Sequence, residues 1–151
     1  MRNSLFYAIL ILLFWAGFVS AISFMEAWLK FRAPGVNLSV GLSIGSLIFT
    51  ALNRVEWVLL LLFLICTLRL FSKKHPVFLF VSGSILLILL LQTFYWLPVL
   101  VERANQIMTG IEVGKSAVHF FYIAAEFIKV NFLLLLAFYF KKQLFERPGT
   151  R

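Results

Sequence analysis

Charged residues are scarce in this sequence, and aspartate is absent. Lys, Arg, Asp and Glu together make up 13% of the 151 residues, and all six acidic residues are glutamates. Soluble domains carry about 25% charged residues, so this chain has about half the usual supply. Hydrophobic residues reach 62%, and a fold of this size cannot hide that much apolar surface from water. Lipid must therefore solvate most of the chain, which argues against a soluble enzyme, a disordered chain and a secreted disulfide scaffold.

The chain also lacks most of the residues that mark metal sites and enzymes. Its one cysteine, Cys66, cannot form an internal disulfide or a multi-cysteine metal site. The two histidines, His75 and His119, are expected near opposite ends of adjacent spans, which argues against a shared metal ion or a haem. No HExxH or Walker motif occurs. We therefore expect no catalytic residues, no metal and no cofactor, and an enzyme is the weaker interpretation.

The net charge of +8 would suggest nucleic-acid binding in a soluble protein. Here the basic residues stand at the ends of apolar runs, where they meet lipid head groups and set the topology. The expected partner is thus the lipid bilayer, and no nucleic acid is expected.

Four apolar runs are long enough to cross a hydrocarbon core of about 30 Å as helices. They cover about residues 4–24, 55–71, 77–97 and 117–140 of one integral membrane domain, residues 1–151. The first is expected to be a retained helix, because the sequence after it is not a clear signal-peptide cleavage site. Pro76 and Pro98 bound the third run and suit helix ends. The predicted fold class is all-α: a polytopic membrane protein with a four-transmembrane-helix bundle.

Residues 38–53 are also apolar and precede the second run without a proline. A single helix from Leu38 to Phe71 would be about 50 Å long, too long for a lipid span at ordinary tilt. Three alternatives remain: an extended second helix that projects beyond the membrane, an interfacial amphipathic helix, or a re-entrant segment. The first two are favoured because nothing at residues 53–56 breaks a helix.

The distribution of Lys and Arg predicts that both termini lie in the cytoplasm. With four spans, the terminal side holds eight basic residues and the opposite side five. The eight are Arg2, Arg69, Lys73, Lys74, Lys141, Lys142, Arg147 and Arg151; the five are Lys30, Arg32, Arg54, Arg103 and Lys115. A bacterial inner membrane is the expected location.

The fourth run carries a polar face inside its apolar sequence. His119, Tyr122, Glu126 and Lys129 fall within an arc of about 80° at 100° per residue. Eleven residues separate Lys129 from Lys141, and they cover about 16 Å of helix, half the hydrocarbon thickness. Ionisable groups at that depth cost at least about 2.5–3.5 kcal/mol, so they should face the bundle and have partners.

Polar residues of the other runs are the candidate cross-helix partners of this face. They are Glu26, Lys30, Arg54, Glu56, Gln92 and Arg103. Glu26 and Lys30 form an i,i+4 pair, which is more typical of an interface anchor. Arg54 and Glu56 are expected to flank the start of the second span.

Two interpretations of the polar face stay open. Glu126 and Lys129 can form a structural pair that holds the bundle together, or a buried site that handles protons, a small solute or a lipid-like ligand. Transport would call for a homodimer, because four helices enclose little aqueous volume. The alternatives are a structural or assembly subunit that docks a membrane partner protein, and an intramembrane enzyme acting on a lipid or quinone.

Several short motifs carry a resemblance. They are FMEAWLKFRAPG at residues 24–35, GLSIG at 41–45, ALNRVEW at 51–57 and HFFY at 119–122, the last followed by Glu126 and Lys129. In these the chain resembles small uncharacterised bacterial four-helix integral membrane proteins. It is distantly similar to the transmembrane protein 205-like families of unknown function. The resemblance implies a four-helix membrane fold and supplies no catalytic residues.

Overall fold

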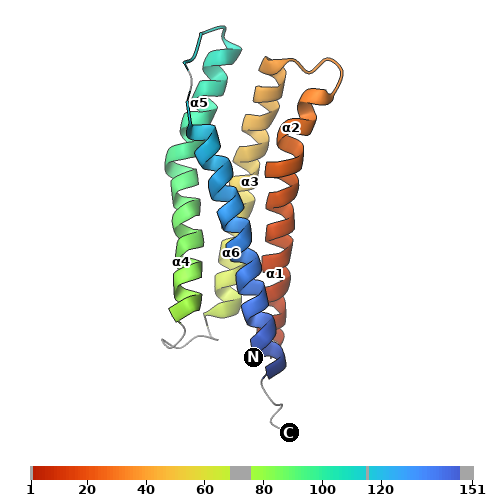
Figure 1. Cartoon of the computed structure of the whole chain (residues 1–151), viewed down its shortest axis with the longest axis vertical. Coiled ribbons are helices and arrows are strands. Elements are labelled where there is room, and N and C mark those ends of the chain that lie inside the picture. Colours follow the sequence, from red (N-terminus) through yellow and green to blue (C-terminus); the bar gives the residue numbers. More distant parts are fainter. Residues whose placement is uncertain (1, 69–75, 115, 147–151) are drawn as a thin grey trace.

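The computed structural model describes residues 2–68, 76–114 and 116–146, and these form four long helices (Figure 1). The first runs from Arg2 to Arg32 through α1 (Arg2–Ser20), the π-helical turn η1 (Ala21–Glu26), α2 (Ala27–Leu29) and the 3-10 turn η2 (Lys30–Arg32). The second is α3 (Leu38–Thr67). The third joins α4 (Pro76–Leu91), the π-helical turn η3 (Gln92–Trp96) and α5 (Leu97–Met108). The fourth is α6 (Val118–Glu146).

Each of these helices is apolar and long enough to cross a membrane. Their apolar spans cover 31, 30, 33 and 28 residues, or about 42–50 Å at 1.5 Å per residue. Each helix is thus longer than a hydrocarbon core of about 30 Å requires. The predicted all-α fold with four membrane-spanning helices is confirmed, and the chain is a helical membrane protein.

The second helix begins 17 residues before the predicted start of its span at Val55. The side chain of Asn37 accepts a hydrogen bond from the backbone N–H of Val40 at 2.9 Å, which caps the helix at its first turn. Residues 38–53 are thus the extended part of one continuous helix, the first of the three alternatives. Its length matches that of its neighbours, since all four helices exceed the hydrocarbon thickness. Residues 69–71 of the predicted span lie outside the described residues.

Pro98 does not end the third helix, and the predicted boundary at Leu97 was wrong. Proline has no N–H to donate, and its ring collides with the carbonyl four residues back in a regular helix. The π-helical turn before Pro98 relieves this conflict, because the N–H of Leu97 bonds to the oxygen of Gln92, five residues back. The helix therefore continues from η3 into α5 as far as Met108.

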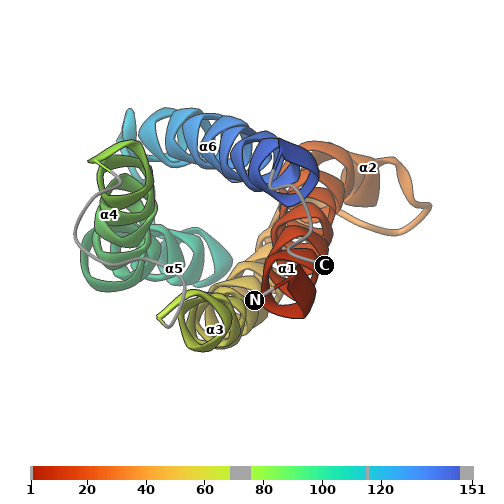
Figure 2. The same cartoon turned by 90° about the horizontal axis from the view of Figure 1, so that it is seen from below.

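The four helices surround a common axis (Figure 2). The first helix packs between α3 and α6. The third helix contacts α3 mainly through α5 and α6 mainly through α4, so it closes the other side of the ring. In Figure 1, α6 runs obliquely, from beside α5 at one end of the bundle to beside α1 at the other.

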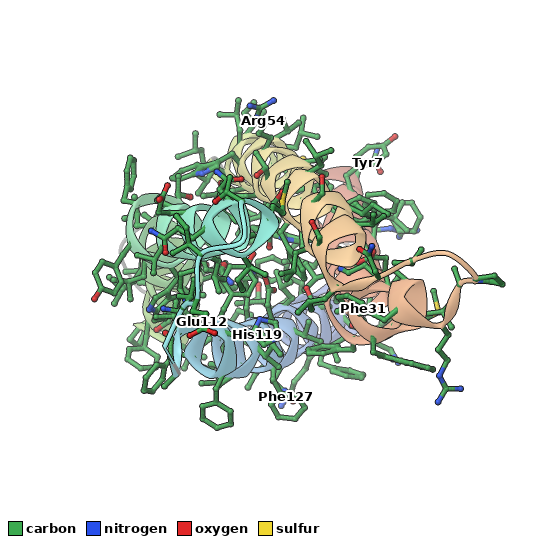
Figure 3. The ribbon with its side chains drawn as sticks, turned by 90° about the horizontal axis from the view of Figure 1, so that it is seen from above. Tyr7, Phe31, Arg54, Glu112, His119 and Phe127 are labelled. Atoms are coloured by element: carbon green, nitrogen blue, oxygen red, sulfur yellow. The ribbon has the colours of Figure 1, made fainter. Side chains whose placement is uncertain are left out.

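Apolar side chains cover both the inside and the outside of the bundle. Leu12, Leu52, Leu89 and Phe140 are among the fully buried residues that form the interior. Large apolar residues also cover the outer surface, where Tyr7 and Phe127 point away from the helices (Figure 3). Such a surface is stable only against lipid.

The start of α1 and the end of α6 lie at the same end of the bundle (Figure 1). We call this the terminal end, and the opposite end, where α2 and α5 lie, the distal end. The predicted orientation rests partly on basic residues that lie outside the described residues: Arg69, Lys73, Lys74, Lys115, Arg147 and Arg151.

Candidate functional site

One polar side chain from each of the first three helices meets two from the fourth at the centre of the bundle. We call these residues the charge cluster: Trp15, Glu56, Gln92, Glu126 and Lys129. All five are 0% exposed, so neither water nor lipid reaches them directly. Their contacts join all four helices at one level.

Lys129 is the centre of the cluster. Its Nζ lies 2.5 Å from Oε1 of Glu56 and 3.0 Å from Oε2 of Glu126. It also donates a hydrogen bond of 2.6 Å to Oε1 of Gln92. Its contacts thus come from three helices, with a hydrogen bond to the amide oxygen of Gln92 and ion pairs to the two carboxylates.

Gln92 and Trp15 complete the network around the carboxylates. The amide nitrogen of Gln92 donates to Oε1 of Glu126 at 2.9 Å, while its amide oxygen accepts from Lys129. The indole N–H of Trp15 donates to Oε1 of Glu56 at 2.9 Å. Oε1 of Glu56 therefore receives both the indole and the ammonium group, whereas no donor reaches its Oε2 among the described residues.

The cluster contains two carboxyl groups and one ammonium group. With all three ionised it carries one net negative charge, and with one carboxyl protonated it is neutral. No other described basic side chain forms an ion pair with either carboxylate. Because a net charge in a low-dielectric interior is strongly unfavourable, the arrangement is suited to holding one proton between two acids.

The π-helical turn η3 places Gln92 in this cluster. Gln92 is the first residue of the turn, and its backbone oxygen accepts the N–H of Leu97. The next residue, Thr93, accepts hydrogen bonds from Asn53 Nδ2 at 3.0 Å and Trp57 Nε1 at 2.9 Å, which ties the turn to α3. A single π-helical turn within an α-helix is frequent at functional sites, where it redirects side chains.

Tyr122 lies one turn from Glu126 on the same face of α6. It is 1% exposed, and its ring packs edge-on against Phe49 with the ring centres 5.5 Å apart. Its hydroxyl has no hydrogen-bond partner among the described residues. Tyr122 therefore borders the cluster on its distal side.

A pocket of about 320 Å³ opens on the distal side of Tyr122. It lies among α2, α3, α5 and α6, and its polar lining comes from Lys30, Ser46, Arg103, His119 and Tyr122. His119 is exposed, so it stands at the rim, and in Figure 3 it is seen from this end. We call this the distal pocket.

The structure thus divides the predicted polar face of the fourth run in two. Glu126 and Lys129 enter the cluster, Tyr122 separates the cluster from the distal pocket, and His119 lies at the pocket rim. Among the predicted partners, Glu56 and Gln92 join the cluster.

The other four predicted partners of the polar face do not enter the charge cluster. Two of them, Lys30 and Arg103, instead line the distal pocket together with His119 and Tyr122. Glu26 and Lys30 pair with each other at 3.3 Å. Arg103 lines the distal pocket and donates to the backbone oxygen of Gly114. Arg54 is exposed on the outside of α3, away from the bundle axis (Figure 3). Arg54 and Glu56 differ in this way because residues two apart point about 200° apart on a helix.

Trp15 and Thr93 are the site residues that the sequence reasoning missed. Trp15 lies deep in the first apolar run, and an indole N–H in lipid needs an acceptor. That requirement indicates that Trp15 has a hydrogen-bond acceptor inside the bundle, but it does not identify the acceptor. Thr93 gave no signal, because a hydroxyl in a membrane helix is usually satisfied by its own backbone, as Thr93 is by Leu89.

Within residues 2–68, 76–114 and 116–146, no group of three or more His, Cys, Asp or Glu side chains is placed to hold a metal ion. His75 lies outside these ranges.

Comparison of the chain with protein families, with curated proteins and with solved structures finds no match. The geometry of the charge cluster and the distal pocket therefore carries the functional argument.

Proposed function

We propose that this protein is a proton-handling membrane protein whose charge cluster binds one exchangeable proton. The observation that carries the proposal is the count of two carboxyl groups to one ammonium group, all at 0% exposure. A proton is the smallest ligand that removes the excess charge, and buried Glu residues are typical proton carriers in membranes.

Glu126 is the carboxyl group that holds the proton in this proposal. Each carboxyl group accepts one hydrogen bond of 2.9 Å from a neutral donor, Glu56 from Trp15 and Glu126 from Gln92. The difference is the ammonium group of Lys129, which lies 2.5 Å from Glu56 and 3.0 Å from Glu126. Glu56 is therefore the better stabilised anion. Because the two acids are coupled through one lysine, the proton belongs to the pair and favours its less stabilised member.

Tyr122 and the distal pocket supply the route by which this proton exchanges. Tyr122 lies between Glu126 and the pocket, and its hydroxyl is an unpartnered buried polar atom among the described residues. On the first helix, Ser23 Oγ is likewise buried without a partner, and it lies between Trp15 and the pocket residue Ala27 along the chain. Buried polar atoms of this kind are the usual contacts of internal water.

Infrared difference spectroscopy of the reconstituted protein tests whether Glu126 holds this proton. Wild type is expected to show the carbonyl stretch of a protonated carboxylic acid, with an intensity that changes over a pH series. Glu126→Gln removes that band, because the remaining Glu56 forms a neutral pair with Lys129. Glu102→Gln is the matched control, since Glu102 is exposed on α5 and its loss should leave the band unchanged.

Stability distinguishes the two acids. Glu126→Gln replaces a neutral acid by a neutral amide and should change the free energy of unfolding by less than about 1 kcal/mol. Glu56→Gln removes the anion that Lys129 and Trp15 both contact, and is expected to cost more. The proposal fails if wild type lacks the acid band or if the intensity of the band does not respond to pH. It also fails if the band persists in both Glu126→Gln and Glu56→Gln.

The resemblance to bacterial four-helix membrane proteins and the distribution of Lys and Arg along the sequence support a location in a bacterial inner membrane with both termini in the cytoplasm. Under this proposal the distal pocket opens to the outer side. Reporter fusions at the C-terminus check the orientation, and a reporter active only outside the cytoplasm should stay silent.

A second candidate function is assembly with a membrane partner, and Arg54 favours it. This residue is exposed on the outside of an apolar helix and has no ion pair or hydrogen bond to another described residue. A cation on a lipid-facing surface usually snorkels to the interface or meets an acidic partner. A second copy of the chain or another membrane helix would supply that contact. Crosslinking from the exposed position 58, one turn further along α3, should capture the partner, and Arg54→Leu should abolish the capture. Capture of lipid alone would contradict this candidate.

A further inference from the structure

We propose that the distal pocket is a binding site for an anionic amphiphile, a carboxylate or phosphate group attached to a short apolar chain. The proposal goes beyond proton binding and stands whether or not the charge cluster releases its proton. It is carried by the size of the pocket, the sign of its charges and the order of its polar and apolar lining.

The size of the pocket suits a small ligand. Its volume of about 320 Å³ lies at the lower end of the range of about 300–1,000 Å³ typical of small-molecule sites. At about 30 Å³ per water, that is room for roughly ten water-sized groups. Octanoate has eight carbons, including the carboxylate carbon, and two oxygens; these ten non-hydrogen atoms make it a suitable probe.

The charged lining of the pocket is of one sign. Lys30 and Arg103 line it together with His119, and no acidic residue lines it. Glu26 contacts Lys30 at 3.3 Å, which offsets part of that charge, while Arg103 has no carboxylate partner among the described residues. The guanidinium group, always charged and rich in donors, is well suited to a carboxylate or phosphate.

The position of Lys30 shows that the pocket is organised around this cation. Its Nζ lies 5.5 Å from the ring centres of both Phe31 and Phe49. Gly45 of α3 faces it, and a Cβ at this position would lie 2.8 Å from Nζ. The glycine therefore leaves space for the ammonium group beside the pocket wall, where it can meet an anion.

The polar and apolar groups follow the direction of a lipid molecule. Arg103 and Lys30 lie toward the distal end, whereas Leu97 and Phe49 line the part of the pocket nearer Gln92 and Glu56 of the cluster along their helices. A ligand with its anionic head at the rim and its apolar chain toward Tyr122 would match both regions. A cation would not match the basic region, and a fully polar solute would not match the apolar region.

Equilibrium binding of radiolabelled octanoate to the full chain in phosphatidylcholine nanodiscs tests the site, with empty nanodiscs as background. Octyl phosphate should compete with octanoate, because it shares the anionic head and the chain. Octanol lacks the charge, octyltrimethylammonium inverts it, and acetate and inorganic phosphate lack the chain. Each of these four should compete at least about tenfold less well.

Variants connect the binding to the pocket. Arg103→Gln should weaken octanoate binding about tenfold, the size expected for one charge-assisted hydrogen bond. Val101→Phe fills the apolar part of the pocket and should abolish binding. Arg32→Gln is the matched control, because Arg32 is exposed at the same end, rests on Trp28 and does not line the pocket. It should change the affinity by less than about twofold.

The outcomes separate this inference from its competitors. If octanol bound as well as octanoate, the ligand would not need an anionic head. If acetate or inorganic phosphate bound as well, the site would be one for a free anion, and the ligand would not need an apolar chain. Equal loss in Arg32→Gln and Arg103→Gln would reduce the effect to general surface charge, and no binding of any probe would refute the site. None of these results depends on the infrared band of the charge cluster, so the two proposals fail independently.

Discussion

The charge cluster and the distal pocket lie on the same helices but differ in whether their polar groups contact one another. In the cluster, charges of both signs meet at 2.5–3.0 Å and are sealed from solvent. In the pocket, charges of one sign line a space that opens at the end of the bundle. The boundary between them is Tyr122, less than two helical turns from Lys129 on one side and one turn from His119 on the other.

The difference follows from how the helices approach one another. Where α6 packs against α1 and α4, side chains from all four helices join one network around Lys129. Toward the distal end α6 lies beside α5 and away from α2 (Figure 1), and side chains there line a space instead of meeting. Close packing makes polar groups satisfy one another, while divergence leaves them available to a ligand.

Lys129→Met should have the largest effect. It leaves Glu56 and Glu126 buried without a cation, and removing one partner of a buried ion pair costs about 3–5 kcal/mol. Unfolding by sodium dodecyl sulfate in mixed micelles measures the loss. The triple variant Lys129→Met, Glu56→Gln, Glu126→Gln has no buried charge and should recover most of it. A triple variant no more stable than Lys129→Met would mean that packing of the lysine stem, rather than charge, dominates.

Trp15→Phe should have an intermediate effect. Phenylalanine keeps an aromatic ring but removes the N–H that reaches Oε1 of Glu56, a hydrogen bond to a charged group worth about 1.5–3 kcal/mol. The same unfolding assay applies. The control is Trp28→Phe, because the Trp28 indole is half exposed and donates only to the backbone oxygen of Phe24 in its own helix. Equal losses of stability in Trp15→Phe and Trp28→Phe would show that the hydrogen bond from Trp15 to Glu56 does not stabilise the cluster.

Gly45→Ala should have the smallest effect on stability and a selective effect on the pocket. The added methyl group displaces the flexible end of Lys30, so unfolding should change by less than about 1 kcal/mol. Octanoate affinity should still fall severalfold, because the ammonium group leaves its place between two rings. Gly83→Ala, where a Cβ meets open space, is the control and should bind octanoate like wild type. Unchanged affinity in Gly45→Ala would exclude Lys30 from ligand contact.

Much of the fold could be read from the chain, and the fourth helix shows why. The spacing of Tyr122, Glu126 and Lys129 placed them on one face, and the short distance to Lys141 placed them near mid-membrane. Those inferences use only helix geometry and membrane thickness. Their outcome, complete burial of all three, follows because lipid does not accept such groups.

The errors have one physical origin. Pro98 was taken as a helix end because proline breaks a regular helix, yet a π-helical turn absorbs it when neighbouring helices hold both sides. Arg54 and Glu56 were treated alike because both lie near the start of an apolar run. Which of two neighbouring residues faces inward depends on the rotation of α3 against its neighbours, and no local pattern encodes that rotation.

Composition and the spacing of apolar and charged residues determined the solvent, the number of helices and the polar face of α6, because each depends on distances within one helix. The tertiary structure alone decided that Glu56 and Gln92 reach Lys129 and that Trp15 reaches Glu56. It also decided that Arg103 and Lys30 line a separate pocket. These pairings depend on the relative height, rotation and tilt of four helices. Such rigid-body quantities arise only when the helices pack together.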